Sequence, residues 1–244
     1  MEYFLNEFDA NGFAGPFEFE DSSIIEQINF AIEHEFELVT SKENPWLDKL
    51  KPYLSEQFSV SPTVCSNTHL SNTDIMALAK DSVITSLIKT LTKTDTFLRR
   101  SQLWVKPAFS RAVAWHQDTH KRKHLGDIGE RIVWVALDDV TIENGCVWLL
   151  KGSHKSGITP PNSLFTIADR INFFNNTEGI FIPPTLEQYE CVPMEMKKGQ
   201  FFIFHQLCFH ASGPNKSNDV RRGLALRYIP KSSQQSVPCV LTAI

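Results

Sequence analysis

The stretch RIVWVALDDVTIENGCVWLL, residues 131–150, sets the first expectation for the fold. Two runs rich in β-branched and aromatic residues, 131–137 and 146–150, lie on either side of a segment that contains Asn144-Gly145. Such runs predict short strands. Asn-Gly is the strongest short hairpin signal, because both residues tolerate a positive φ. We therefore expect a β-hairpin at this place.

Comparable runs recur from residue 101 to residue 230, separated by turn signals: SQLWVKPAF, AVAWHQD, YECVP, QFFIFH and RGLALRYIP. About eight short strands joined by turns are typical of a sandwich or barrel of the jelly-roll kind. In the first hundred residues, apolar side chains instead recur at helical spacing, which predicts helices near Ser23, near Ser71 and after Asp81. The expected fold class is mainly β with flanking helices, a cupin-like jelly roll with a helical N-terminal part packed on one face.

We expect a single domain over residues 1–244, with a mainly helical part at 1–98, a jelly-roll core at 99–230 and a C-terminal tail at 231–244. Residues 158–188 fit neither the helical nor the strand pattern. A connection of this length is uncommon unless it is functional. We predict that it forms a lid or a pocket wall, and the alternative is a surface insertion.

The amino-acid composition indicates which kinds of binding partner the protein is expected to lack. The net charge is −4 without a basic block, which argues against nucleic acid, because neutralising phosphates requires clustered Lys and Arg. No window approaches the ~18 consecutive apolar residues of a membrane span, and the acidic N-terminus differs from the basic start of a secretory signal. Five cysteines without a CxxC pair are typical of reduced thiols. We expect a cytoplasmic protein with neither nucleic-acid nor membrane partners, and the oligomeric state stays open.

His116 and Asp118 form the first candidate metal-binding pair. Residues two apart on a strand project to the same face, so the imidazole and the carboxylate would point together. A third ligand would come from QFFIFHQLCFHAS, which offers His205 and His210. Two His and one carboxylate are the ligand set of non-haem Fe(II) oxygenases. The alternative is a pair of polar residues at the end of a strand.

Three segments together resemble the phytanoyl-CoA dioxygenase family: WHQD at 115–118, WVALDDVTIENGCVWLLKGSHKSG at 134–157 and GQFFIFHQLCFHASGPNKSNDVRRGLALRYIP at 199–230. The N-terminal NGFAGPFEFEDSSIIEQI is also similar to the start of that family. The resemblance implies a double-stranded β-helix that uses Fe(II), 2-oxoglutarate and O2. It also implies that His210, in HASGPN, is the distal iron ligand, with His205 as the alternative.

The distal carboxylate of 2-oxoglutarate would need a cationic partner, since a buried carboxylate is costly unless it is paired. The planar fork of arginine meets both carboxylate oxygens. The resemblance places this arginine eleven residues after the distal histidine, at Arg221. Arg222 would face the other way on a strand, and Arg227 has the parity of Arg221. Both remain alternatives.

Three further side chains are candidates for the cosubstrate pocket. Ser212 resembles the hydroxyl that touches the same carboxylate in the family. Gln102 and Lys106 lie on the preceding predicted strand with matching parity.

The function implied by the resemblance is an Fe(II)- and 2-oxoglutarate-dependent dioxygenase. It would hydroxylate or otherwise oxidise an unactivated C–H bond of a small metabolite, amino-acid-like or a natural-product intermediate, releasing succinate and CO2. Asp118 disfavours halogenation, because the halogenating relatives carry Ala or Gly in place of the carboxylate. Two alternatives stay open: a zinc-dependent hydrolase or isomerase that uses the same ligands, and a non-catalytic cupin-like binding protein.

Overall fold

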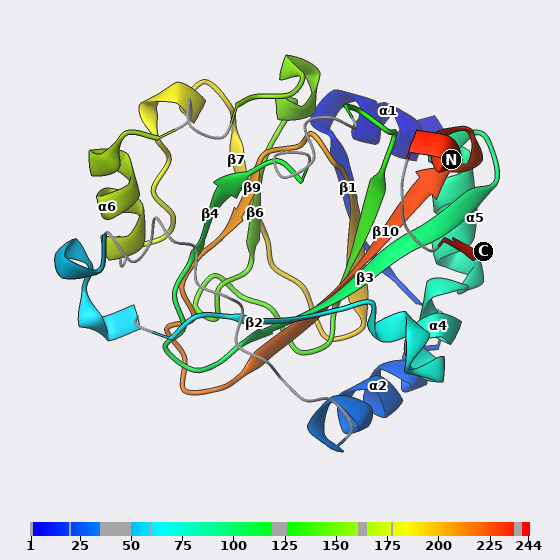
Figure 1. The fold of residues 1–244 in the computed structure, drawn as a ribbon, viewed down its shortest axis with the longest axis horizontal. Coiled ribbons are helices and arrows are strands. Elements are labelled where there is room, and N and C mark those ends of the chain that lie inside the picture. Colours follow the sequence, from blue (N-terminus) through cyan, green and yellow to red (C-terminus); the bar gives the residue numbers. More distant parts are fainter. Residues whose placement is uncertain are drawn as a thin grey trace.

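The computed structural model describes residues 2–19, 21–34, 50–58, 60–118, 126–160, 165–176, 178–236 and 241–244. Among these residues, two antiparallel sheets of seven and four strands face each other (Figure 1). The larger sheet runs in the order β1-β8-β5-β10-β3-β11, with β2 also paired to β3, and the smaller sheet in the order β4-β9-β6-β7. This arrangement confirms the predicted mainly β, jelly-roll class.

The strands of the larger sheet are β1 (Phe13–Glu18), β2 (Thr63–Ser66), β3 (Thr96–Lys106), β5 (Arg131–Ala136), β8 (Gln200–His205), β10 (Arg221–Pro230) and β11 (Thr242–Ala243). Those of the smaller sheet are β4 (Val113–His116), β6 (Val147–Leu150), β7 (Cys191–Met194) and β9 (His210–Ser212). The α-helices are α1 (Glu2–Asn11), α2 (Ser23–His34), α4 (Thr73–Ala79), α5 (Ser82–Thr92) and α6 (Ile167–Asn175). Short 3-10 helices are η1 (Lys51–Tyr53), η2 (Glu56–Phe58), η3 (Thr68–Leu70), η5 (Ser153–Ser156), η7 (Pro184–Leu186) and η8 (Lys231–Ser236).

The predicted hairpin at 131–150 is wrong. The two strands join different sheets, since β5 pairs with β8 and β10 whereas β6 pairs with β7 and β9. The turn between them does form: the Cys146 N–H donates to the Thr141 carbonyl, and Gly145 has a φ of 82°. A hairpin signal specifies a local turn but not the strand that follows as a partner. The chain uses the turn to cross from one sheet to the other.

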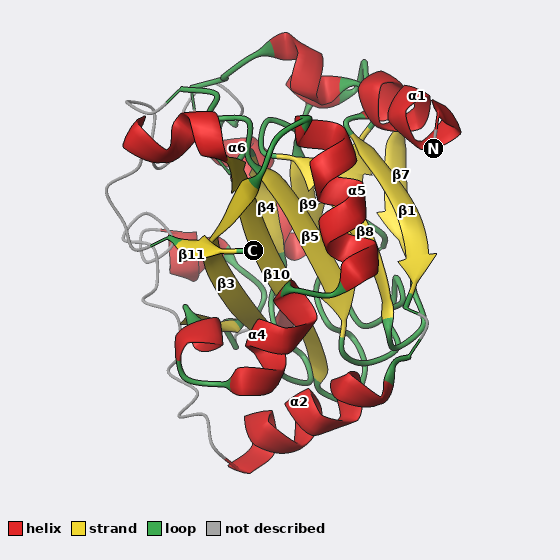
Figure 2. Ribbon diagram, turned by 90° about the vertical axis from the view of Figure 1, so that its right-hand side faces the viewer, coloured by secondary structure: helices red, strands yellow, loops and turns green. Residues whose placement is uncertain are grey.

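The strands of the larger sheet are apolar on both faces because both faces are covered. Val133, Ile203 and Leu224 belong to a cluster that includes residues of α2, α4 and α5. Those helices lie over the sheet in Figure 2. On the inner face, Ile132 and Phe202 pack with residues of the smaller sheet. The helices near Ser23, near Ser71 and after Asp81 are as predicted, and Asp81 caps α5 by accepting from backbone N–H groups.

The predicted boundaries between a helical part and a β part are less sharp in the structure. β1 and β2 come from the first hundred residues and pair with β8 and β3. The C-terminal tail adds β11 to the edge of β3. Residues from both predicted parts therefore pack in the same apolar clusters, as β1 and β2 residues do with those of β8 and β3. None of the described helices combines the length and the apolar character that crossing a bilayer requires.

The described part of 158–188 packs on the outer face of the smaller sheet. Phe165, Phe173 and Leu186 form a cluster there with Trp115 and Phe209, and α6 lies on the side of that sheet away from the larger one (Figure 1). No described residue of this segment lines the central cavity. The segment therefore buttresses the small sheet, and the structure gives no support to its prediction as a pocket wall.

His205, the last residue of β8, is buried, and the partly exposed His154 lies beside it. His205 Nδ1 accepts the Leu207 N–H at 3.1 Å, so Nδ1 carries a lone pair, and its ring lies 5.5 Å from that of His154. Burial, reinforced by the positive charges of Arg131 and His154, lowers the pKa of His205 from 6.5 to about 3. Between those two pH values the unfolded chain binds a proton that the folded chain does not. Stability must therefore fall as pH falls through this window.

Replacing His205→Asn, whose amide oxygen can accept the same N–H, is expected to flatten this pH dependence. Between pH 7.5 and pH 5 the free energy of unfolding should decrease in both proteins. The decrease should be about 1 to 2 kcal/mol larger in the wild type than in the variant. Urea titrations in the presence of a chelator measure this difference, with the exposed His34→Asn as the control. An equal loss in wild type and His205→Asn would contradict the assignment.

Gly145 is required for a second reason besides its φ. A Cβ built there would lie 2.6 Å from the Gly213 carbonyl oxygen, whereas at Gly179, whose φ is 71°, nothing lies within 4 Å. Both Gly145→Ala and Gly179→Ala incur the left-handed backbone cost of roughly 1–2 kcal/mol. Gly145→Ala should lose a further ~1–3 kcal/mol from the steric clash. Urea unfolding of both variants tests this, and similar losses would show that the close approach to Gly213 is unimportant.

Candidate metal centre

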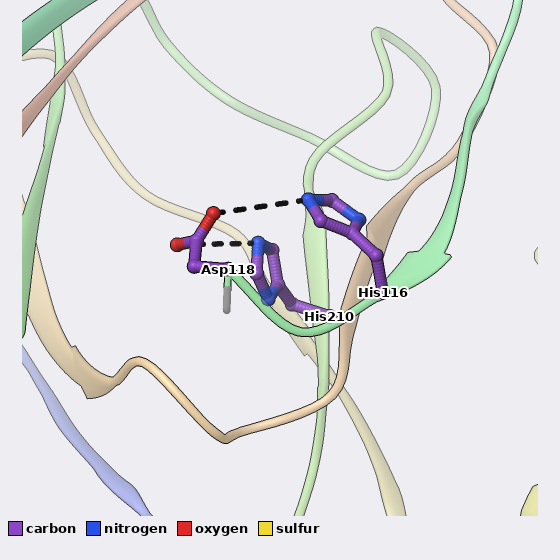
Figure 3. Close-up of side chains that lie close together, drawn as sticks. All are labelled: His116, Asp118 and His210. Carbon is purple, nitrogen blue, oxygen red and sulfur yellow. Dashed lines mark ion pairs between the residues drawn. The ribbon is translucent and has the colours of Figure 1, made fainter. Parts of the chain in front are cut away.

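The pairing of β4 with β9 brings together two histidines that are far apart in the sequence. His116 is the last residue of β4, His210 is the first of β9, and the two are direct cross-strand partners. Their ring centroids lie 4.1 Å apart. Figure 3 shows both rings turned toward the carboxylate of Asp118.

Hydrogen bonds set the tautomers of both rings. His116 Nδ1 lies 2.8 Å from the Ala114 carbonyl oxygen, and His210 Nδ1 lies 3.0 Å from that of Cys208. Since a carbonyl can only accept, each Nδ1 must carry the proton, which leaves the Nε2 lone pairs for a metal ion. Burial, and then the charge of His210, lower the pKa of His116 to about 3, so its ring is neutral near pH 7.

Asp118 follows β4 and completes the group. Its Oδ1 lies 4.0 Å from His116 Nε2, and its Oδ2 lies 3.9 Å from His210 Nε2. Its backbone N–H donates to the Gln206 carbonyl at 3.0 Å, which anchors the chain just past the strand end. Gln117 points elsewhere, as alternation predicts, and donates to the carbonyls of Gly157 and Leu207.

These three residues form a group whose ligand atoms all lie within 4.8 Å of one another. Among the residues that the structure describes, it is the single group of at least three His, Cys, Asp or Glu with such spacing. Two imidazole nitrogens and one carboxylate oxygen on one side of an ion fit a divalent metal with open positions on the other side. His205, the alternative distal ligand, is not in the group.

A buried ion-pair network lies directly behind Asp118. Arg227 Nη2 donates to Asp118 Oδ1 at 2.8 Å, and Arg227 Nη1 lies 2.8 Å from Oδ2. Burial on its own would raise the pKa of Asp118, but Arg227 and the two histidines outweigh it and hold the pKa well below its usual range. Arg227 also contacts Glu130, which is paired with Arg99. The sequence showed only that Arg227 shares the parity of Arg221, because its partners come from distant segments.

Two cations lie side by side at another part of the same cavity. Arg221 and Lys106 are direct partners between β10 and β3, and both are buried, with 2% and 1% of their surface exposed. Burial, together with the charge of Arg221, holds the pKa of Lys106 well below its usual range; burial also lowers that of Arg221 to about 10. Within the described residues, neither side chain has an ion pair with a carboxylate.

Arg221 retains hydrogen-bonding capacity. Its Nη2 donates to the Gly145 carbonyl at 2.5 Å, and its guanidinium stacks on the ring of Trp134, 5.4 Å from the centroid. Among the described residues its Nε has no partner, and the buried hydroxyl of Ser212 has none either. Lys106 Nζ donates to the carbonyls of Arg111 and Gly213. Buried donors without protein partners are rare in folded proteins, and a bound ligand or an ordered water would satisfy them.

One cavity connects the two groups. Its walls are mainly apolar and include both of them: Trp104, Lys106, Val113, His116, Asp118, Trp134, Val147, Phe204, His210, Ala211, Ser212, Arg221, Ala225 and Arg227. Gln102 is not among them, because its amide oxygen accepts from Arg227 Nε at 2.7 Å. Of the two predicted neighbours on β3, Lys106 lines the cavity and Gln102 does not. Arg222, one of the predicted alternatives, points to the other face, where it is paired with Asp138 and Glu33.

The profile of the phytanoyl-CoA dioxygenase (PhyH) family matches residues 8–223 of this chain. Phytanoyl-CoA dioxygenase 1 of Oryza sativa subsp. japonica is 36% identical over 97 residues, which cover 40% of this chain and 32% of that protein. A probable alpha-ketoglutarate-dependent hypophosphite dioxygenase of Stutzerimonas stutzeri is 27% identical over 71% of this chain and 59% of its own length. The match thus spans about a third of the length of the first curated relatives.

Solved structures share the fold at low sequence identity. The alpha-ketoglutarate-dependent epimerase SnoN from nogalamycin biosynthesis superposes with a TM-score of 0.70 at 19% identity, covering 94% of this chain and 82% of SnoN. EctD from S. alaskensis, solved with 2-oxoglutarate and 5-hydroxyectoine, gives a TM-score of 0.67 at 18% identity, covering 96% and 77%. Since the family profile extends over most of the chain and the fold agrees, this chain belongs to the phytanoyl-CoA dioxygenase family.

Proposed function

We propose that this chain is an Fe(II)- and 2-oxoglutarate-dependent oxygenase that oxidises an unactivated C–H bond of a small molecule. His116, Asp118 and His210 would bind the iron, and Arg221, Ser212 and Lys106 would receive the distal carboxylate of the cosubstrate. One observation carries the proposal: a three-ligand group and two unbalanced buried cations share one cavity. Membership of the family supports the reaction class.

The donor set suits this iron chemistry. The His116 imidazole is neutral near pH 7, both rings have Nδ1 hydrogen-bonded to a carbonyl, and the pKa of Asp118 lies well below its usual range, so the group is prepared to bind a metal. When bound, iron and 2-oxoglutarate supply the activation of O2, with oxidative decarboxylation to succinate and CO2. Three protein ligands leave room for the cosubstrate and O2 beside them.

The cation pair provides binding energy for a dicarboxylate. A carboxylate between Arg221 and Lys106 would neutralise charges that burial disfavours, and it would accept from Arg221 Nε and the Ser212 hydroxyl. The Trp134 ring fixes the guanidinium plane. Gly223 makes this possible, because a Cβ there would overlap the indole.

The apolar part of the cavity wall excludes water from the reacting centre. Trp134, Val147 and Phe204 line it together with the ligand residues. Excluding water strengthens the electrostatic interactions inside and prevents side reactions. A hydrolase or a storage protein would leave the Arg221 Nε and the Ser212 hydroxyl without a ligand, so these groups favour the oxygenase. Asp118 occupies the carboxylate position, which favours hydroxylation or a related oxidation over halogenation.

A screen of small metabolites tests the reaction class and the substrate together. Protein supplied with Fe(II), 2-oxoglutarate and O2 is expected to release succinate, with a slow rate alone and a faster one with a true substrate. Asp118→Ala should abolish this release while the fold persists, whereas Asp138→Ala, which breaks an ion pair outside the cavity, should not. Normal turnover by Asp118→Ala would refute the ligand assignment.

Arg221→Gln is expected to weaken 2-oxoglutarate binding selectively. Loss of a charge-assisted contact to a buried carboxylate costs about 2 kcal/mol or more, which raises the KM for 2-oxoglutarate roughly 30-fold. Arg222→Gln on the opposite face is the matched control and should leave that KM unchanged. An unchanged KM in Arg221→Gln, with the melting temperature retained, would move the cosubstrate site elsewhere.

A further inference from the structure

The guanidinium of Arg227 engages the whole carboxylate of Asp118. Its Nη2 donates to Oδ1 at 2.8 Å, and its Nη1 lies 2.8 Å from Oδ2. Both side chains are 9% exposed. A guanidinium that donates to one oxygen and lies in ion-pair contact with the other restricts the rotation of the carboxylate as well as its position. Asp118 therefore has less freedom than a carboxylate held by its own chain alone.

Arg227 is itself held from two other sides. Its Nε donates to the amide oxygen of Gln102 at 2.7 Å, and its Nη1 lies 3.3 Å from Glu130 Oε2. The other oxygen of Glu130 is paired with Arg99. The backbone N–H of Glu130 donates to the side-chain amide oxygen of Gln206. The backbone carbonyl of Gln206 accepts from the backbone N–H of Asp118. The network thus closes on the backbone that carries the metal ligand.

Burying this network has a large desolvation cost, so stability alone does not explain it. A buried ion pair pays a desolvation penalty that its Coulomb energy only partly offsets, and apolar side chains of similar volume often serve as well. Here four charged groups, two cations and two anions, lie buried together. What apolar residues could not do is orient the Asp118 carboxylate.

That orientation decides how a metal ion would be bound. A freely rotating carboxylate can offer one oxygen or both to a metal. Asp118 presents Oδ1 near His116 Nε2 and Oδ2 near His210 Nε2, at 4.0 and 3.9 Å, so either mode is within reach. The hydrogen bond from Arg227 occupies Oδ1, whereas Oδ2 has no hydrogen-bond partner among the described residues, so the carboxylate offers one unengaged oxygen to a metal. Binding through one oxygen leaves more coordination positions for the cosubstrate and O2.

We propose that Arg227 is a positioning residue that orients Asp118 and limits it to one metal-binding oxygen, with Gln102 and Glu130 fixing Arg227 in turn. This inference rests on the proposed function, because it takes the His116, Asp118 and His210 group as the metal site. It assigns Gln102 to this network instead of to the cosubstrate.

Anaerobic titration of the apo protein with Co(II) tests the proposal without relying on turnover. Arg227→Gln is expected to raise the Kd for Co(II) 10- to 100-fold, the usual effect of losing a group that orients a ligand. At saturating Co(II) its visible absorption spectrum should also change, because the carboxylate can then bind through two oxygens. Arg227→Lys keeps the charge without the fork, and should restore only part of the affinity.

Three controls separate the outcomes. Arg222→Gln removes an ion-paired arginine from the same strand on the opposite face, and it should match the wild type. Gln102→Leu leaves the ion pairs intact and should give a smaller change in the same direction. It keeps the test valid if Arg227→Gln fails to melt cooperatively. The KM for 2-oxoglutarate at saturating metal should stay within about twofold of the wild type in Arg227→Lys, since the cation pair at Arg221 is untouched.

Wild-type Co(II) affinity and an unaltered spectrum in Arg227→Gln and Gln102→Leu would overturn the positioning role. Failure of the underlying metal site looks different: Asp118→Ala would then bind Co(II) as tightly as the wild type, whatever the state of Arg227. A loss of melting temperature alone, with affinity and spectrum retained, would assign Arg227 to stability and reject the proposal.

Discussion

The site depends on the antiparallel pairing of β4 with β9. That register makes His116 and His210 direct neighbours although 94 residues separate them in sequence. The backbone carbonyls of Ala114 and Cys208 then hold both rings with Nε2 facing the same space. Each short strand has a further support. β9 pairs with β6 on its other side, and β4 packs against the apolar cluster around α6.

The larger sheet supplies the charges that the small sheet lacks. On β10 the inward positions carry Arg221 near one part of the cavity and Arg227 near the group of His116, Asp118 and His210, with Gly223 and Ala225 leaving room between them. The two arginines have opposite surroundings. Arg227 is balanced by buried carboxylates, whereas Arg221 is not, among the residues that the structure describes. The balanced Arg227 is suited to a permanent structural role. The unbalanced Arg221 is suited to binding an anionic ligand reversibly.

Local patterns predicted the parts of the fold that depend on the chain's own periodicity. The strand runs, the helices beginning at Ser23, Thr73 and Ser82, and the shared face of His116 and Asp118 all follow from side-chain alternation or helical spacing. The resemblance to the family supplied His210 and Arg221. The parity of β10 correctly turned Arg222 outward, where it meets Asp138.

Features that depend on pairing between distant segments were missed. Asn144-Gly145 predicted a turn but not that β5 and β6 would enter different sheets. Glu130 and Gln102 became partners of Arg227 only because β3, β5 and β10 are neighbours, and no short motif marks that relation. Lys106 and Arg221 meet through the β3–β10 register. Such contacts require the strand order, which local periodicity does not contain.

The most direct measurement of the central claim is a crystal structure of the protein grown anaerobically with Mn(II) and 2-oxoglutarate. The account predicts one anomalous scattering peak bonded to His116 Nε2, His210 Nε2 and a single Asp118 oxygen. It also predicts the distal carboxylate of 2-oxoglutarate against Arg221 and Ser212. A metal bound elsewhere, or a cosubstrate carboxylate that leaves Arg221 Nε without a partner, would contradict it.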